Sequence, residues 1–440
     1  MSWSLYISLS AMMFLEYAVW GAWMPVLAPR LLGPLKMTGK QCGWIFATLP
    51  LACIVAPMLA GQVADKWLNT EWLLAGAHLA GAVLLFVAAK QEKFTPMFVV
   101  MLLYSMCYAA TMPLVNSLMF AQLAKAVPPD EVSGASAKVF IMAPIAWALI
   151  GYLLTGWRQV SKTEGGAPDG FVLGGLLSVV MGVVCLFLPA TPPAGGGESA
   201  PMFEALALLR DGDFLVFIVI SMVLAGMMQF YFMGTGAFMQ DIGISGKNVS
   251  GAMGMAQAAQ AIATLFALGV LLDQLDKISP GHQYKWSLVI GAASWLGLYV
   301  IYVFMPRPAP VVVCQAFHGV AYVTFMIAGQ VYAGQYAPKE IGGSVQALIF
   351  AATTGVGLFL ATQLVGFVMD RNNVQGKLQW RNIWLVPLGI MAAGVIALIV
   401  GFQGNLPDRG KPAEKGAAVQ RSLEQAPQPG PAVGSTSLLG

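Results

Sequence analysis

The hydrophobic residues of this chain fall into twelve long runs, separated by short breaks that are polar or contain proline or glycine. Most runs have about 20 residues, the helix length that crosses ~30 Å of hydrocarbon at 1.5 Å per residue. A backbone in lipid must satisfy its own hydrogen bonds, so we expect these spans to be helices. The expected spans are residues 4–28, 40–64, 71–90, 96–122, 133–157, 170–189, 213–239, 248–272, 285–304, 309–336, 342–369 and 382–403.

The longest interior break divides the spans into two groups of six. It contains Pro192-Pro193 and a run of three glycines from Gly195. Within it, residues 202–209 are a candidate for a short helix on the membrane surface. The C-terminal end is rich in Pro, Gly, Gln and Ser, a composition typical of disorder. The expected parts are an N-terminal six-helix half (1–189), a central cytoplasmic linker (190–212), a C-terminal six-helix half (213–403) and a disordered tail (404–440).

Composition supports a membrane protein. Hydrophobic residues make up 58% of the chain and charged residues 10%, whereas soluble domains carry roughly 25% charged residues. The net charge is +3 with scattered basic residues, so nucleic acid is not an expected partner. The five cysteines form no close pair, and we interpret them as small buried residues without disulfides or metal. The first run lacks a cationic start and a cleavage site, which favours a retained span over a signal peptide.

Two short motifs at equivalent positions indicate that the halves are repeats. Residues 61–66 (GQVADK) end the second span, and residues 269–273 (GVLLD) end the eighth. In each, glycine and aspartate lie four residues apart on one helix face. Glycine there allows close helix approach, and aspartate can accept hydrogen bonds from a neighbouring helix N-terminus. We therefore interpret Asp65, Lys66 and Asp273 as gating residues between the halves; the alternative for Asp65 is a helix cap. Parallel six-span halves are typical of the major facilitator superfamily.

Glu16 lies near the middle of an otherwise uncharged span. A carboxylate in hydrocarbon costs several kcal/mol unless it is buried, paired or protonated. We therefore predict that Glu16 carries a coupled proton and faces a central cavity, within reach of the second half. The alternative is a hydrogen bond that only fixes helix packing. Trp20 and Trp23 follow at i+4 and i+7 on the same face and are candidates for substrate contact.

Several neutral polar or aromatic residues in other spans are further candidates for substrate contact. Asn116, Gln229 and Gln260 lie within apolar runs. They either contact a substrate or form interhelical hydrogen bonds, which are worth ~0.6–2 kcal/mol. His318 and Tyr322 lie at positions i and i+4 of the tenth span, on one helix face. Such an aromatic face can stack on a planar ring. Ordinary packing is the alternative for both.

Three segments carry a resemblance to a known family. Residues 14–23 (FLEYAVWGAW), residues 61–68 (GQVADKWL) and His78 with the small residues after it resemble the bacterial nucleoside:proton symporters of the major facilitator superfamily. Through the first 120 residues the matching segments occur in the same order as in the family. The expected spans correspond to those of the family up to about residue 400. The resemblance implies an all-α membrane protein with 12 transmembrane helices in two six-helix pseudo-repeats. It also implies proton-coupled uptake of nucleosides or related small ring compounds by alternating access.

The same resemblance implies a location in the cell inner (cytoplasmic) membrane with both termini in the cytoplasm. The distribution of Lys and Arg among the loops does not favour that orientation. No cofactor is expected, because the proton gradient would drive transport. The expected partners are a small-molecule substrate, protons and the lipid bilayer, and the chain is expected to be a monomer.

The departures from the family pattern fall on the substrate site. Ile145 and Leu149 stand where the family has an arginine and a threonine that contact the nucleoside. Phe232 stands where the family has an asparagine, and Ala263 and Val323 stand where it has acids. Much of the family's polar site is therefore absent, whereas the kept residues are Gln229, Gln260 and Tyr322.

Glu16 is itself a departure, because the family has glutamine there, and we expect it to take over the proton role. His78 matches the family, and we interpret it as part of tight packing among small residues. Two other functions stay open: transport of a different, less polar small molecule, and a membrane sensor that does not transport. An intramembrane enzyme is disfavoured, because the three histidines, His78, His282 and His318, stand in no catalytic motif.

Overall fold

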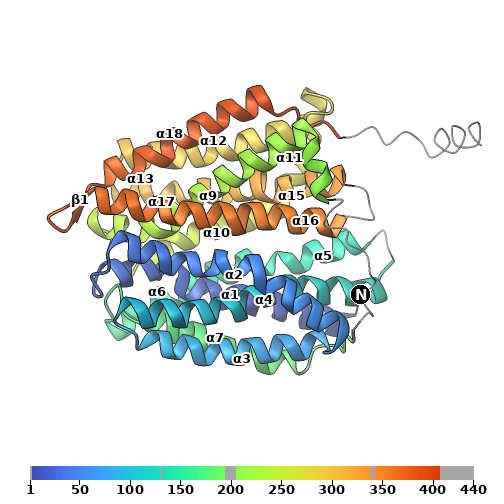
Figure 1. The fold of residues 1–440 in the computed structure, drawn as a ribbon, viewed down its shortest axis with the longest axis horizontal. Helices are drawn as coiled ribbons and strands as arrows, with labels where there is room; N and C mark the ends of the chain where they lie inside the picture. The colour runs from blue at the N-terminus through green and yellow to red at the C-terminus, as the bar shows by residue number, and fades with distance from the viewer. Residues whose placement is uncertain (1, 129–130, 194–204, 338–341, 407–440) are drawn as a thin grey trace, which may run out of the picture. The chain divides into compact units, whose positions relative to one another are not determined.

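The computed structural model describes residues 2–128, 131–193, 205–337 and 342–406. Long helices lie side by side along one direction, with those of the first half below and those of the second half above in Figure 1. Ten of the described helices are long and apolar enough to cross a membrane, and one bent helix pair also meets that test as a unit. The chain is therefore an all-helical, multi-pass membrane protein, as the hydrophobic runs predict.

The first half follows the predicted spans closely. The two helices α5 and α6 together make one candidate span, and α7 is a shorter apolar helix. The bounds are α1 Trp3–Leu32, α2 Gly39–Lys66, α3 Thr70–Ala89, α4 Phe94–Ala126, α5 Val132–Phe140, α6 Met142–Ser161 and α7 Asp169–Cys185.

The second half contains more interruptions. Two π-helical segments, η2 and η4, lie within candidate spans, and a two-stranded antiparallel hairpin joins the last two spans. The bounds are η1 Leu208–Arg210, α9 Gly212–Asp241, α10 Val249–Phe266, α11 Leu268–Ile278, α12 Gln283–Phe304, α13 Pro308–Val313, α14 Gln315–Ala321, η2 Tyr322–Ile327, α15 Ala328–Tyr336, α16 Gly342–Phe350, η4 Ala351–Gly357, α17 Leu358–Arg371, β1 Asn373–Val374, β2 Lys377–Leu378 and α18 Trp380–Gly401.

The eighth predicted span, 248–272, is not one straight helix. It is divided into α10 and α11, which are bent by 60° at Ala267. The second part carries Asp273, Asp276 and Lys277 and buries none of its residues. These charges are costly in hydrocarbon, which accounts for the departure of α11 from the path of α10.

Two predicted segments lie largely outside the described residues. Of the proposed surface helix at 202–209, the structure describes a helical turn at 205–207 followed by the 3₁₀ turn η1. Of the proposed tail, it describes only residues 404–406.

The two halves approach closely between α2 and α17 and between α6 and α10. A Cβ atom on Gly43 would lie 2.6 Å from the carbonyl oxygen of Thr362, and one on Gly151 would lie 2.8 Å from the carbonyl oxygen of Ser250. Only glycine permits backbones this close. At Gly61 and Gly269, where close helix approach is predicted, no described atom lies within 4 Å of such a Cβ. The halves are therefore in tight contact at one end of the bundle, and not at these glycines.

Candidate functional site

Aromatic rings cross from the first half to the second at the centre of the bundle. The ring of Trp20 on α1 lies 5.5 Å from that of Trp147 on α6, which lies 6.3 Å from Phe232 on α9. Phe232 lies 5.8 Å from His318 on α14. We call these four residues the aromatic band. It includes two of the predicted site residues, Trp20 and His318, and joins four spans.

Backbone packing brings this band together. A Cβ on Gly21 of α1 would lie 3.2 Å from the Trp147 Cα, so α1 and α6 are in close contact beside Trp20. On α9, Gly236 packs against Pro29 of α1. Phe232 and Gln229 lie four and seven residues before Gly236, on the same helix face. That face therefore directs Gln229 and Phe232 toward the first half.

Four of the predicted substrate-binding residues carry a buried polar atom with no hydrogen-bond partner among the described residues. They are Trp20 Nε1, Asn116 Oδ1, Gln229 Oε1 and His318 Nε2. Such an atom costs about 1–3 kcal/mol when it is left unpaired. Other unpaired atoms occur elsewhere in the bundle, but Trp20 Nε1 and His318 Nε2 belong to rings of the aromatic band itself. A polar ligand at the aromatic band would supply the missing partners.

The hydrogen bonding of His318 defines which ring nitrogen carries its proton. The indole Nε1–H of Trp295 lies 3.2 Å from His318 Nδ1, and an indole N–H can only donate. Nδ1 must therefore accept, which places the hydrogen of the neutral ring on Nε2. The unpaired Nε2 is thus a free donor. One face of the ring is covered by Tyr231, whose centroid lies 3.9 Å away in a stacked arrangement.

Gln260 and Tyr322 lie beside this part of the second half. A Cβ on Gly319, the residue after His318, would lie 2.6 Å from the backbone nitrogen of Gln260, so α10 and α14 meet at that point. Tyr322 begins the π-helix η2 and is close enough to Tyr17 of α1 to interact with it electrostatically. Both predicted residues therefore lie on elements adjacent to the band.

Trp23 is not part of the band. Its indole N–H donates to the hydroxyl of Tyr104 at 3.1 Å, and its ring stacks on Phe171 at 6.2 Å. Both partners belong to the first half, and the Trp23 side chain is buried there. The spacing of Trp20 and Trp23 on one helix cannot reveal this difference, because it depends on which helices lie behind α1.

Glu16 does not face the second half, and the prediction that it does is wrong. Its carboxylate contacts His78 Nε2 at 2.8 Å through Oε2, and the Thr111 hydroxyl lies 2.8 Å from Oε1 and 2.7 Å from the Tyr108 carbonyl, to either of which its one hydrogen can be donated. Tyr108 donates to the backbone carbonyl of Glu16, also at 2.8 Å. All three partners lie on α3 and α4 of the first half. The reason is electrostatic, because an acid buried in a helical bundle is stabilised where donors and an imidazole surround it.

Helix α11 lies at the same end of the bundle as the N-terminus (Figure 1). Lys66 ends α2, and Asp273 lies on α11; both are exposed. The side chain of Asp65 lies outside the described residues. In this conformation Lys66 and Asp273 therefore do not lie in a closed contact.

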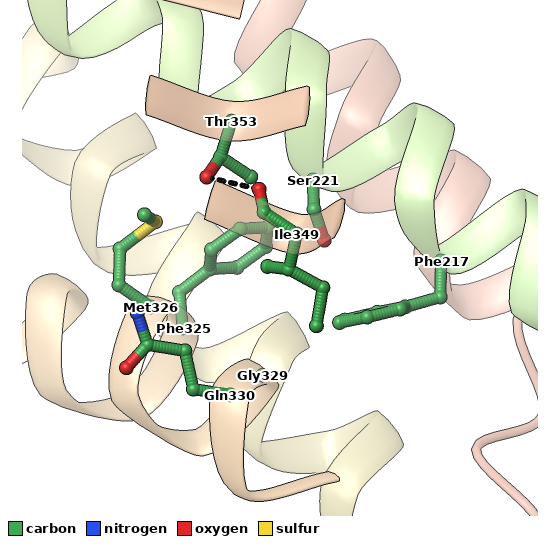
Figure 2. Close-up of a pocket in the computed structure, with 8 residues that line it drawn as sticks. All are labelled: Phe217, Ser221, Phe325, Met326, Gly329, Gln330, Ile349 and Thr353. Carbon is green, nitrogen blue, oxygen red and sulfur yellow. Dashed lines mark hydrogen bonds between the residues drawn. The ribbon is translucent and has the colours of Figure 1, made fainter. Parts of the chain in front are cut away.

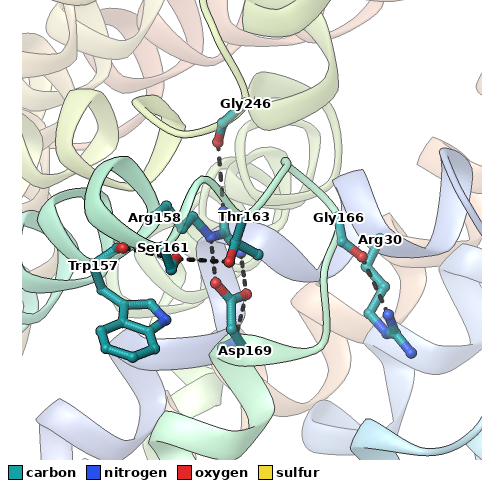
Figure 3. Close-up of polar contacts among 9 residues, drawn as sticks. Arg30, Trp157, Arg158, Ser161, Thr163, Gly166, Asp169 and Gly246 are labelled. Carbon is teal, nitrogen blue, oxygen red and sulfur yellow. Dashed lines mark hydrogen bonds and ion pairs between the residues drawn. The ribbon is translucent and has the colours of Figure 1, made fainter.

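The opposite end is closed by polar contacts between the halves. Arg158 of α6 donates two hydrogen bonds to Asp169 of α7, at 2.7 and 2.5 Å, and a weaker one at 3.5 Å to the carbonyl of Gly246 in the second half (Figure 3). The carboxylate of Asp370 at the end of α17 accepts the backbone N–H of Gly39 at the start of α2. No sequence pattern identifies these residues, because a charge next to a loop looks the same whether or not it forms a contact between the halves.

A separate hollow lies within the second half (Figure 2). It contains none of the predicted site residues, and the π-helices η2 and η4 both contribute to it. Its lining residues are Phe217, Ser221, Phe325, Met326, Gly329, Gln330, Ile349 and Thr353. The Thr353 hydroxyl already donates to the Ile349 carbonyl at 2.7 Å. The lining is largely apolar and includes none of the unpaired polar atoms found among the described residues, two of which belong to the aromatic band.

Many membrane-length helices packed side by side, with an aromatic band across them that carries unpaired N–H donors, are features of a secondary transporter. The comparisons with known proteins agree. Residues 3–406 match the profile of the family described as "Nucleoside H+ symporter", and the chain belongs to that family.

Individual relatives cover nearly the whole chain. The nucleoside permease NupG of Escherichia coli (strain K12) is 25% identical over 91% of this chain and 96% of its own length. The xanthosine permease of the same organism is 24% identical over 91% of this chain and 97% of its own length. A crystal structure of the nucleoside transporter NupG superposes with a TM-score of 0.77 at 23% identity, covering 90% of this chain and 98% of that one. The fold is therefore that of this transporter.

Proposed function

We propose that the chain is a proton-coupled uptake transporter of nucleosides or closely related small ring compounds. Family membership supports the class of activity. The observation that carries the substrate assignment is the pair of unpaired N–H donors within the aromatic band, Trp20 Nε1 and His318 Nε2, together with the unpaired amide oxygens of Asn116 and Gln229 on α4 and α9. The band supplies flat apolar surfaces, and the unpaired atoms supply the hydrogen-bonding groups that a planar base with a ribose requires.

The unpaired atoms include both kinds of hydrogen-bonding group. Trp20 Nε1–H and His318 Nε2–H are donors, and Asn116 Oδ1 and Gln229 Oε1 are acceptors. A nucleoside offers base carbonyls and ring nitrogens to the donors, and ribose hydroxyls and base N–H groups to the acceptors. Each bond that forms contributes roughly 0.5–1.5 kcal/mol. Gln260 and Tyr322, on adjacent elements, complete the proposed pocket.

The first half is less polar in this region than the family pattern. Ile145 and Leu149 lie one turn apart on α6, and Leu149 is 52% exposed. Neither can form the charged and hydroxyl contacts that the family pattern implies. We therefore propose weak nucleoside binding, or a substrate with few polar groups on this side. A less polar small molecule is the second candidate that these two residues favour.

We also propose the full architecture of twelve spans in two six-helix repeats. The ten span helices, the bent pair α10–α11 and the shorter α7 together would supply twelve crossings (10 + 1 + 1). Both termini would lie in the cytoplasm, so the contacts of Arg158 and Asp370 would close the outer end. Asp65, Lys66 and Asp273 would act as the inner gate when the opposite state forms. Glu16 remains the proposed proton-binding residue, and the transporter would act as a monomer.

Transport by purified protein in proteoliposomes tests this function. We expect counterflow exchange of radiolabelled uridine or adenosine, and accumulation when the outside is made acidic. Trp20→Phe keeps the ring and removes the donor, so nucleoside Kd should rise about 2- to 10-fold. Trp23→Phe is the matched control, because its N–H bonds Tyr104, and it should leave Kd unchanged.

Absence of nucleoside exchange in the wild type would refute the substrate assignment. In that case, exchange of an apolar ring compound would support the second candidate. An equal loss of affinity in both tryptophan variants would show that the aromatic band is not the binding site.

A further inference from the structure

Two ionisable side chains form a contact inside the first half, behind the aromatic band. Glu16 is 0% exposed and His78 is 2% exposed, and their Oε2 and Nε2 atoms lie 2.8 Å apart. Burying a charged pair costs several kcal/mol of solvation unless further hydrogen bonds compensate. The stability of this buried contact therefore depends on how many protons the two side chains hold.

The hydrogen bonds around the pair can be counted. The Ser178 hydroxyl donates to the backbone carbonyl of His78 at 2.8 Å, which uses its only hydrogen. The contact of 3.2 Å between Ser178 Oγ and His78 Nδ1 must then use a hydrogen on Nδ1. A neutral imidazole has only one hydrogen, so the 2.8 Å contact to Glu16 needs a second one. The observed geometry is therefore satisfied when the pair holds one extra proton.

The other titratable groups around the pair are neutral acids. Tyr104 and Tyr108 of α4, Tyr17 of α1 and Cys185 of α7 each lie close enough to Glu16 to interact electrostatically. Among the described residues, the ion-pair partner of Glu16 is His78. The charge of the Glu16 carboxylate is thus balanced by a proton on the pair itself.

Tyr108 connects this pair to the proposed substrate site. Its hydroxyl donates to the backbone carbonyl of Glu16 at 2.8 Å, and its ring lies 6.1 Å from that of Trp20. Trp20 and Glu16 are also one helical turn apart on α1. The Glu16–His78 pair therefore lies directly behind Trp20, which faces the proposed substrate site. At this place the charge of the pair can influence the position of α1.

We propose that Glu16 and His78 form a proton-binding dyad that carries the coupled proton within the first half. This inference rests on the proposed transport function and adds His78 to it. In the loaded state the dyad holds one proton and is neutral, as carboxylate with imidazolium or as carboxylic acid with imidazole. Release transfers that proton to water and leaves carboxylate with neutral imidazole, with a net charge of −1. The hydrogen bond of His78 to Ser178 or to Glu16 is then lost. Ser178 and Tyr108 are positioning residues, because they act through the dyad.

The test measures uridine accumulation and proton uptake in the same proteoliposomes, with a pH-sensitive dye trapped inside. Glu16→Gln should reduce acid-driven accumulation and uridine-dependent proton uptake to the level of empty vesicles, while uridine counterflow continues. His78→Gln should have the same effect. The matched control is His282→Gln, because His282 is exposed at the start of α12 and bonds the Gln403 carbonyl; it should retain coupling.

Wild-type accumulation in Glu16→Gln, with proton uptake intact, would overturn the proposal. Loss of counterflow in the wild type would instead refute the proposed function, which keeps the two failures distinguishable.

Ser178→Ala provides a test that does not remove a dyad member and so reduces the risk of misfolding. It removes the acceptor of the Nδ1 hydrogen, which is needed most when the dyad is loaded. Proton affinity should fall by up to about tenfold, so the pH of half-maximal accumulation should move lower by as much as about one unit. A purely structural role for Ser178 would lower protein yield or Tm without moving the pH profile. A profile that coincides with wild type would overturn the dyad.

Discussion

Substituting Gly43 by leucine should open the closed end of the bundle. A Cβ at this position would lie 2.6 Å from the Thr362 carbonyl oxygen, whereas ordinary contacts begin near 3.4 Å. The α2 and α17 backbones must therefore separate by several tenths of an ångström, and by more for a full leucine side chain. Overpacking of this kind costs about 1–3 kcal/mol. Because the cost applies only when this end is closed, it should shift the ratio of open to closed states by about 5- to 150-fold.

Distances between spin labels measure this shift. Labels at Lys40 and Arg371, which are exposed on the two sides of the contact, should report one short distance in the parent protein and an added longer population in Gly43→Leu. Gly61→Leu is the matched control on the same helix, since no described atom lies within 4 Å of its Cβ. The distance distribution of Gly61→Leu should contain no additional population at longer distances. An unchanged distribution in Gly43→Leu, or the same opening in Gly61→Leu, would refute the reasoning.

Three further variants test the side-chain assignments. Asp169→Asn leaves the buried Arg158 without its counter-charge, so the free energy of unfolding should fall by about 3–5 kcal/mol, and an unchanged Tm would contradict the ion pair. Trp23→Phe removes the hydrogen bond to Tyr104 and should cost about 1 kcal/mol of stability. Its uridine Kd in calorimetry should stay at the wild-type value, and weaker binding would place Trp23 in the pocket. His318→Phe keeps an aromatic ring but removes the free Nε2–H donor, so calorimetry should give a Kd about 2- to 10-fold higher; equal affinity in a folded variant would exclude His318 from the site.

The helices could be located from the sequence because membrane insertion depends on local composition. The span expected at 213–239 is α9, Gly212–Asp241, and the span expected at 40–64 is α2, Gly39–Lys66. Each span must be apolar over its own length, so neighbouring residues alone define it. The bend between α10 and α11 was not predicted, because an apolar run gives its length and not its direction.

The membership of the chain in its family also follows from local segments. Residues 14–23 and 61–68 carry the patterns from which the family was expected, and the family profile matches residues 3–406. These segments do not define which substrate and proton contacts this chain retains. Single differences from the family pattern, such as Ile145 and Val323, change the chemistry of the site and leave the fold intact.

Tertiary structure decided which polar residues meet. Glu16 and His78 are 62 residues apart in the chain, and only the packing of α1 against α3 brings them to 2.8 Å. Trp20 and Trp23 look alike on one helix, yet one has an unpaired N–H beside the second half and the other bonds Tyr104 within the first. An apolar pattern specifies that a helix is buried in a bundle. The partner of each buried polar atom depends on the rotation and neighbours of that helix, which are properties of the whole assembly of spans.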